Sequence, residues 1–588
     1  MSFIFNLSQK ATSSFKRFPV TLIWAIFGSF YLISVYGIDD FDLIQQNEGF
    51  ILVLILGVSW LIGSQFLSEA LKHNPLNRFA FKLSIIIALA LFSYYIYNIE
   101  IDISEKVYDR WALLLLAGHI FVGFAPFVNT WHKNKFWNYL KSIIVALFRS
   151  GLYAVVLYIG LALAISALEL LFDAEFNSNI YLQTFIFCLG IVNTFVYLSD
   201  FPRIDKLDHK VDFSKASEVL ILYILIPLSL LYMLIVYVYV LKILIDWELP
   251  RGWVTYLITA LSLLAFLIHI AIEPIRKTHK SKLIQKFFPY YFWSILPLIP
   301  LLFIALYRRI AEYNFTELRY LGLVLAIWIL GMLIYMIISN KKDLSIYAKS
   351  VFLLILLSTF GPLSAFKISI NAQYSELEEL MQKLDNKPEK SFTAGEFKRF
   401  KSIIQYISNR NALNKTKAYF GFDPKLAFSE TTTYDLPKKI ADSLNIQIIP
   451  SNNNSKTVWT YRSSLLKSKY AEEINAYTHF TELILSNSRN NNTPLHLHFD
   501  RNNIIAFRYY DEVLLKTDLT NHLKAMAGKY DYLNDAPQQE FSFRFKNDKG
   551  DFLMIFDRLS YTLKNNEVKI INGQAKMFYM TYQGLELP

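Results

Sequence analysis

The chain has 588 residues, of which 54% are apolar and only 18% are charged, and its formal net charge is +11. Soluble domains carry about 25% charged residues, so this composition indicates that lipid surrounds much of the chain. The positive charge falls in alternate loops between apolar blocks, which argues against a nucleic-acid partner and in favour of membrane topology.

Eleven apolar blocks precede Lys367. A helix needs about 20 apolar residues to cross roughly 30 Å of hydrocarbon, and within lipid only a helix satisfies its own backbone. We therefore predict a membrane all-α domain over residues 1–366, a polytopic helical bundle of about 11 transmembrane helices. The blocks lie at 19–37, 49–70, 80–98, 111–129, 151–172, 180–198, 219–241, 253–272, 289–307, 319–338 and 346–366.

Lysines and arginines predict the side on which each loop lies. With the N-terminus in the cytoplasm, the inward loops hold 22 of these residues and the outward loops only 7. This is the asymmetry that the positive-inside rule requires. An odd number of spans then leaves the C-terminal domain outside, in the periplasm of a bacterium whose inner membrane holds the chain. The outward cations are Lys106, Arg110, Lys242, Arg251, Arg308, Arg309 and Arg319.

Residues 367–588 have the pattern of a soluble α+β domain with a mainly antiparallel sheet. Thr393 and Glu396 form a capping-box sequence ahead of an apolar helical face. Alternating residues across 495–509 and 541–556 predict strands joined by tight turns. Asn572-Gly573, between two apolar runs, predicts a two-residue hairpin.

Several segments resemble a family of bacterial multi-pass membrane proteins known only by a domain-of-unknown-function label. The resemblance implies an inner-membrane location and brings no reaction, ligand or catalytic residue. In that family a glycine often follows the tyrosine of the third segment, where this chain has Asn314. The segments are Arg17-Phe18-Pro19, Trp247–Val254, Arg308–Tyr313 with Arg319-Tyr320, and Gly361–Phe366.

The outward ends of the later spans carry a cluster of charged residues. Adjacent arginines at a membrane interface suit bidentate capture of a lipid phosphate or another anion. Alternatively, these charges form the seam on which the soluble domain docks, because structural ion pairs produce similar clusters. The candidate binding residues are Asp246, Glu248, Arg251, Arg308, Arg309, Glu312 and Arg319.

Ionisable residues inside the spans form a second candidate. His119 lies midway along the fourth span and could relay a proton or line a path. His269 and Glu273 lie near the inner end of the eighth span. A neutral histidine that is hydrogen-bonded to a neighbouring helix explains such a position equally well.

Two further patterns are weaker. The acidic loop Asp39–Asp42 resembles the first outer loop of membrane glycosyltransferases that use lipid-linked sugars, but it is short for such a site. His496 and His498, with His479 in the same region, could bind zinc or copper only if a third ligand converged.

The sequence favours a non-enzymatic envelope protein that presents a periplasmic ligand- or partner-binding domain. Its expected partners are the lipid bilayer and, at the outer face, an anionic lipid or an envelope protein. The alternatives are a transporter of a small or lipidic solute and a transferase that uses a lipid-linked substrate. No catalytic residue, metal site or cofactor is predicted, because the chain has no phosphate-binding glycine loop, nucleophile elbow or HExxH motif.

Overall fold

The computed structural model describes residues 12–38, 41–99, 105–203, 207, 210–211, 213–246, 253–339, 343–429, 431–449, 457–462, 474, 477–486, 494–500, 503–529, 533, 536–564 and 567–582. Contacts divide the chain into two compact units, residues 1–449 and 450–588. The first unit therefore includes the helices that follow Phe366, where the composition changes from apolar to polar.

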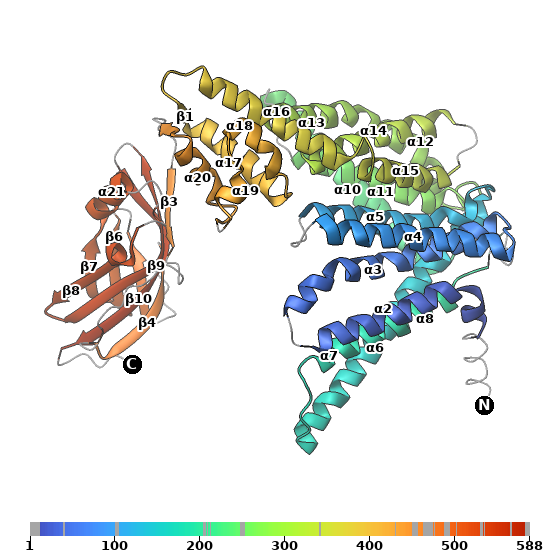
Figure 1. The fold of residues 1–588 in the computed structure, drawn as a ribbon, viewed down its shortest axis with the longest axis horizontal. Coiled ribbons are helices and arrows are strands. Elements are labelled where there is room, and N and C mark those ends of the chain that lie inside the picture. The colour runs from blue at the N-terminus through green and yellow to red at the C-terminus, as the bar shows by residue number, and fades with distance from the viewer. Residues whose placement is uncertain are drawn as a thin grey trace. The chain divides into compact units, whose positions relative to one another are not determined.

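Ten helical segments among the described residues are long and apolar enough to cross a membrane, and the shorter helix α15 (Ser345–Thr359) is apolar as well (Figure 1). The predicted membrane helical bundle is confirmed. The long segments are α2 (Pro19–Gly37), α3 (Phe41–Ala70), α4 (Pro75–Ile99), α5 (Glu105–Phe124) with η1 (Ala125–Phe127), α6 (Lys133–Phe172), α7 (Ile180–Ile186) with η2 (Phe187–Asn193) and α8 (Thr194–Ser199), α9 (Lys215–Val219) with η4 (Leu220–Leu225) and α10 (Ile226–Asp246), α11 (Trp253–Ile272), α12 (Lys282–Ile295) with η5 (Leu296–Leu298) and α13 (Ile299–Tyr313), and α14 (Glu317–Ile338).

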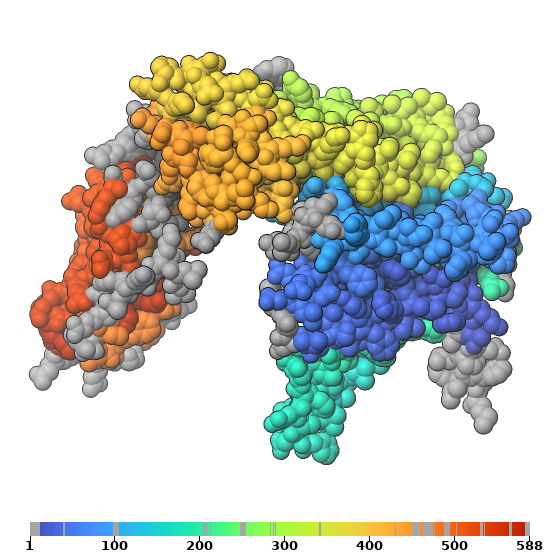
Figure 2. Space-filling model, in the orientation of Figure 1, coloured from blue at the N-terminus to red at the C-terminus, as the bar shows by residue number. Residues whose placement is uncertain are grey.

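The helix α6 is unusual in its length and exposure. It runs for 40 residues without a break, about 60 Å at the rise of an α-helix. Its C-terminal end protrudes beyond α2 and α3, in teal in Figure 2. Leu170, Leu171 and Phe172 there are 79%, 75% and 73% exposed. Side chains of this kind are stable at such exposure where lipid covers them.

Contacts at the helix ends agree with a chain that crosses a membrane in alternate directions. Arg17, before the first segment, forms a salt bridge of 2.9 Å with Glu69 at the end of the second. It also donates to the carbonyl of Phe201, just after the sixth segment (3.1 Å). Lys133, at the start of the fifth segment, donates to the carbonyl of Glu273, just after the eighth (3.0 Å). Each pair joins ends that alternate crossing brings to one side.

A small helical layer completes the first unit and has its own apolar core. The capping box at Thr393 and Glu396 is present, with Glu396 N–H donating to the Thr393 hydroxyl at 3.3 Å. Two short strands pair in parallel at its edge. In Figure 2 the side chains of this layer, yellow to orange, pack on those of the preceding helices. The elements are α16 (Ala365–Asp385), β1 (Ser391–Thr393), α17 (Ala394–Asn409), η6 (Leu413–Thr416), α18 (Lys417–Phe420), α19 (Pro424–Ala427), α20 (Leu436–Ser443) and β2 (Gln447–Ile449).

The second unit is a sheet of eight strands, in which β3-β9-β10-β4-β5-β6-β7 are neighbours and β8 also pairs with β9. All pairs are antiparallel except β4 with β5, so the predicted mainly antiparallel sheet is confirmed. One helix, α21 (Thr520–Lys529), packs on it through Leu523, whose carbonyl accepts from the Tyr561 hydroxyl at 2.8 Å. The strands are β3 (Thr457–Arg462), β4 (His479–Ser486), β5 (Leu495–Phe499), β6 (Ile504–Tyr509), β7 (Glu512–Asp518), β8 (Ser542–Asn547), β9 (Gly550–Lys564) and β10 (Glu567–Thr581).

The predicted hairpin at Asn572-Gly573 is wrong. Both residues lie inside β10, where the register shifts between Ile570 and Asn572 as at a β-bulge. A Cβ on Gly573 would lie 3.0 Å from the carbonyl oxygen of Arg558 on β9. The glycine thus permits a close approach of two strands, which is the other common reason for a glycine within a strand.

Candidate functional site

The turn between α15 and α16 is held by a network of hydrogen bonds. Gly361 has a φ of +81°, a left-handed conformation that glycine adopts without steric cost. The N–H of Ser364 donates to the Gly361 carbonyl (3.3 Å), and its hydroxyl donates to the Thr359 carbonyl (3.2 Å). Tyr320 on α14 donates its hydroxyl to the Leu363 carbonyl at 2.7 Å. These bonds fix the first turn of α16 beside the ends of two spans.

Arg410, which follows α17, connects the helical layer to two other spans. Its Nε donates to Glu317 (2.7 Å) and one terminal nitrogen to Glu105 (3.3 Å), while the other lies 3.9 Å from Asp109. The side chains of Arg410 and Glu317 are only 11% and 4% exposed. Burial alone would lower the pKa of Arg410, but the hydrogen bond and charge of Glu317 raise it above its ordinary value. The guanidinium therefore stays charged.

These contacts also support the count of crossings. Glu105 begins the fourth apolar segment and Glu317 begins the tenth. Thr359 ends α15, and it lines the same pocket as Arg410. Eleven alternate crossings bring the starts of the fourth and tenth spans and the end of the eleventh to one side. The shorter helix α15 thus fits the place of an eleventh span.

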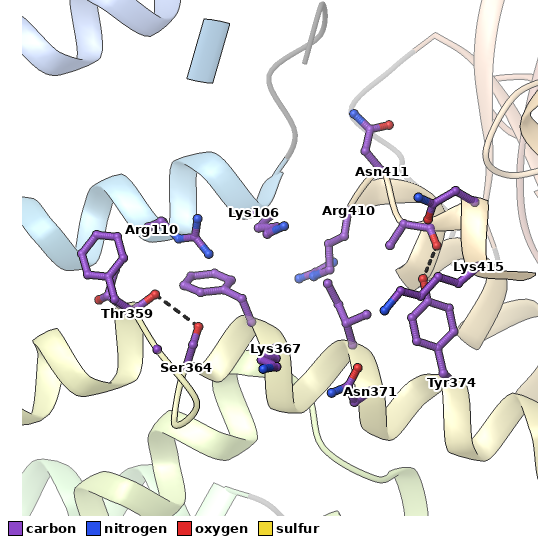
Figure 3. Close-up of a pocket in the computed structure, with 16 residues that line it drawn as sticks. Lys106, Arg110, Thr359, Ser364, Lys367, Asn371, Tyr374, Arg410, Asn411 and Lys415 are labelled. Carbon is purple, nitrogen blue, oxygen red and sulfur yellow. Dashed lines mark hydrogen bonds between the residues drawn. The ribbon is translucent and has the colours of Figure 1, made fainter. Parts of the chain in front are cut away.

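A pocket of about 420 Å³ opens beside Arg410 and lies within the size range of small-ligand sites. Its walls come from α5, the α15–α16 turn, α16 and the segment after α17 (Figure 3). None of its 16 lining residues is acidic. Five are cationic, and we call this site the basic pocket: Lys106, Arg110, Lys367, Arg410 and Lys415.

The lysines of the basic pocket keep their charge available. In the described part of the chain Lys106, Lys367 and Lys415 form no salt bridge, whereas Arg410 has acidic partners outside the lining. Lys367 and Lys415 are exposed. A lysine without a carboxylate partner attracts mobile anions more strongly than one whose charge is already balanced.

Arg110 is held by aromatic side chains and not by an acid. Its guanidinium carbon lies 4.8 Å from the ring centre of Phe366, and a terminal nitrogen donates to the Tyr95 hydroxyl at 2.7 Å. Its Nε is buried and has no hydrogen-bond partner among the described residues. A buried donor without a partner is costly, so an acceptor brought by a ligand would be stabilising here.

Tyr374 positions the far wall of the pocket. Its hydroxyl donates to the carbonyl of Ala412, in the segment between Arg410 and Lys415. Burial, with a smaller contribution from Tyr419, raises the pKa of Tyr374 to about 12. The phenol is therefore neutral at physiological pH and can act as a donor to that carbonyl.

The predicted outer-face cluster is only partly brought together. Arg319 donates to the carbonyls of Tyr313 and Asn314 at 3.0 and 2.9 Å, so it closes the turn between α13 and α14. Arg308 pairs with Glu312 one turn along α13 (3.0 Å), with both side chains over 40% exposed. These contacts are structural, and they leave a binding role for the cluster as a prediction.

Of the other members of that cluster, Arg309 lies close enough to Arg319 for the two positive charges to repel each other. Arg309 is exposed on α13, and Asp246 is exposed at the end of α10. Glu248 and Arg251 lie outside the described residues, as does most of the resembling segment Trp247–Val254.

The turn after α13 docks on α16 through Asn314 and not through the charged cluster, whose role as a seam stays a prediction. Asn314 has a φ of +55°, so it takes the backbone conformation for which glycine is favoured. Its side-chain amide donates to the Ala372 carbonyl and to Glu376, both at 3.2 Å. Gln373 donates in return to the Phe315 carbonyl at 2.9 Å. Two of the resembling segments, those at 308–320 and 361–366, therefore lie on one docking seam.

The histidines of the spans have separate environments. His269 is buried, with Nδ1 3.1 Å from the Tyr347 hydroxyl and Nε2 3.4 Å from Glu273. Arg276 Nε also lies 2.9 Å from Glu273, which gives a buried polar network at the C-terminal end of α11. His119 lies elsewhere, on the wall of a second cavity.

The described residues form no metal site at either of the two weaker patterns, the loop Asp39–Asp42 and the histidines of β5. Asp39 and Asp40 lie outside the described residues, and Asp42 belongs to α3. His496 and His498 are on β5, but no three histidine, cysteine or acidic side chains gather as metal ligands within the described ranges.

Sequence reasoning missed the basic pocket. Lys106 and Arg110 were two of the seven outward cations, and Arg410 and Lys415 had no motif around them. The signal in the sequence was that Lys106 and Arg110 depart from the positive-inside rule. Lysine and arginine are disfavoured in outward loops, so a binding role is one reason for their presence there.

The fold and the basic pocket define a multi-pass helical membrane protein with a cation-lined site where spans end. The chain belongs to the family described as Domain of unknown function (DUF4153), whose model matches residues 27–376. That match includes Lys106, Arg110 and Lys367 and stops before Arg410.

A relative from Pasteurella multocida (strain Pm70), named Uncharacterized protein PM1469, is 25% identical to this chain over 400 residues. The alignment covers 66% of this chain and 62% of the relative, so the chain spans less than two thirds of that protein's length. A comparison with solved structures finds no match.

Arg410→Ala should destabilise the first unit, because it leaves the carboxylate of Glu317 buried without a partner. Breaking a buried pair costs about 3–5 kcal/mol, which thermal unfolding of the full chain in detergent will show as a lower Tm. The double variant Glu317→Gln with Arg410→Met should recover part of that loss, because no charge remains buried.

Arg309→Ala is the matched control, since Arg309 is exposed on α13, and it should change stability by no more than about 0.5 kcal/mol. An Arg410→Ala chain that unfolds at the parent's temperature would contradict the role given to this contact.

Proposed function

We propose that this chain is a non-enzymatic protein of the bacterial inner membrane that binds an anionic phosphate group at its periplasmic face. The observation that carries the proposal is the charge of the basic pocket, in which five lining residues are cationic and none is acidic.

Phosphate is the anion that best fits the donors present. Arg110 offers a buried Nε that lacks a partner, and guanidinium groups bind phosphate oxygens with fixed geometry. Lys106, Lys367 and Lys415 add point charges that can adapt to the ligand. The first turn of α16 also lines the pocket, and the N-terminus of a helix favours negative charge.

An anionic lipid is the source of phosphate that the apolar wall favours. Phe360 and Ile370 line the pocket beside the cations, and Phe360 is 48% exposed. The pocket opens where spans end, at the depth where a lipid headgroup and its glycerol would lie. A free phosphate ion would gain nothing from these apolar side chains.

The periplasmic assignment rests on charge. The inward loops of the predicted topology hold 22 lysines and arginines against 7 in the outward loops. The basic pocket contains two of those seven outward cations, Lys106 and Arg110. The predicted topology has its last span before Lys367, so we assign residues 450–588 to the periplasm as well, where an envelope partner could bind them.

Removing two exposed cations should weaken lipid binding without unfolding the protein. In native mass spectrometry of the full chain, Lys367→Ala with Lys415→Ala should retain phosphatidylglycerol about 3- to 10-fold less well, since each exposed charge contributes up to about 1 kcal/mol. Added salt should reduce retention by the parent chain, because it screens exposed charges.

Arg309→Ala removes an exposed cation outside the basic pocket and should retain phosphatidylglycerol within about twofold of the parent. Glycerol 1-phosphate, titrated separately, distinguishes a lipid from a soluble phosphate ester as the ligand. Equal retention of phosphatidylglycerol and phosphatidylcholine, with no binding of the soluble ester, would contradict the proposal.

Cysteine accessibility tests the side of the membrane. In a Cys188→Ala background, Glu389→Cys should react with a membrane-impermeant maleimide in intact spheroplasts. Lys280→Cys should react only after permeabilisation, because its loop lies inside. Both positions are exposed, and the native cysteine is buried. The reverse pattern would place the basic pocket in the cytoplasm and overturn the assignment.

A further inference from the structure

A second cavity lies within the spans, between α2, α3, α5 and the segment from α7 to α8. Its volume is about 540 Å³, and its walls are mostly apolar side chains such as Leu54, Ile55 and Leu189. His119 and Asn193 bring polar groups to the same wall, together with the hydroxyls of Thr194 and Tyr197. A cavity of this kind suits a ligand that is apolar along most of its length.

Two of the polar side chains there offer a hydrogen-bond acceptor. The Oδ1 atom of Asn193 is buried and has no partner among the described residues. His119 Nδ1 lies 2.8 Å from the carbonyl of Leu115. A carbonyl can only accept, so Nδ1 carries the hydrogen and, in the neutral ring, Nε2 is left as an acceptor.

Three side-chain donors on the same wall are already used. Trp24 Nε1 donates to the Leu54 carbonyl at 2.8 Å. The hydroxyl of Ser29 donates to the Ala25 carbonyl at 2.7 Å, and that of Ser59 donates within its own helix at 3.2 Å. Their oxygens can still accept. Asn193 Oδ1 can accept, while the side-chain amide of Asn193 and the hydroxyls of Thr194 and Tyr197 can donate. The wall therefore suits a ligand hydroxyl, which can both donate and accept.

The backbone beside Asn193 is locally distorted. Residues Phe187–Asn193 form a π-helix between α7 and α8, a geometry that occurs mostly as short insertions within α-helices and is frequent at functional sites. Within it Gly190 packs against α2 so closely that a Cβ would lie 2.1 Å from the Ser29 hydroxyl oxygen. Gly190, which packs closely against α2, and Asn193, which lines the cavity, thus belong to the same π-helical segment.

We propose that this cavity binds a long-chain alcohol from within the bilayer, with its hydroxyl donating to Asn193 or His119 and its chain against the apolar wall. An acyl chain of a bulk lipid would fill the space and leave the Asn193 acceptor unsatisfied, which is unfavourable among apolar side chains. This site is separate from the basic pocket and does not depend on its function.

Photolabelling of the full chain in nanodiscs tests this proposal. The probes are a diazirine-bearing tetradecanol and its methyl ether, which has the same chain and no donor. The alcohol should label peptides that contain residues 115–122 and 185–197 about 3- to 10-fold more than the ether does, since one hydrogen bond in a membrane interior has roughly that effect.

Asn193→Leu should remove most of the preference for the alcohol and leave labelling by the ether unchanged. Thr255→Val is the matched control, because the Thr255 hydroxyl is also buried without a partner among the described residues but lies on α11, away from this cavity. It should keep the preference. If Asn193→Leu does not fold, His119→Phe provides the same test.

Equal labelling of these peptides by alcohol and ether in the parent chain would overturn the proposal, since the cavity would then hold bulk lipid chains only. A preference that survives both Asn193→Leu and His119→Phe would overturn it as well. Lys367→Ala with Lys415→Ala should not alter this labelling, so failure of the basic pocket and failure of this site are distinguishable.

Discussion

The contact between Arg410 and Glu317 is the interaction on which the rest of the functional architecture depends. Two opposite charges are buried where they would be costly alone, so each requires the other. Glu317 begins α14 and Arg410 follows α17. The ion pair between them therefore fixes the helical layer on the membrane spans. Glu105 extends the same contact to α5. The basic pocket is the space that remains between the helices this contact holds together.

The two ends of the spans use charge differently. At one end, ion pairs such as Arg17 with Glu69 join neighbouring spans. At the other end Glu105, Asp109 and Glu317 surround Arg410, whereas the lysines of the basic pocket form no salt bridge among the described residues. An acid beside Lys367 or Lys415 would have cancelled the field that the site offers to an anion. The separation of paired from unpaired cations is what distinguishes a binding surface from a structural ion-pair network.

Much of the fold could be predicted from sequence because its causes are local. Spans follow from the length of apolar blocks, and the helix at Thr393 follows from a capping box whose two residues are three apart. The hairpin prediction at Asn572-Gly573 was wrong because this dipeptide occurs both in hairpin turns and in β-bulges. Only the pairing of β10 with β9 distinguishes the two. The candidate site depends on contacts between distant residues, since Arg410 meets partners 93 and 305 positions away. No spacing in the sequence encodes such a contact, although Lys106 and Arg110 were among the few cations in the predicted outward loops.

A cryo-EM structure of the full chain in nanodiscs that contain phosphatidylglycerol would test the central claim most directly. The account predicts that Arg410 contacts Glu317 and that headgroup density lies in the basic pocket between Lys106, Lys367 and Lys415. A map in which Arg410 is separated from Glu317, or in which ordered headgroups bind elsewhere and leave the basic pocket empty, would contradict it.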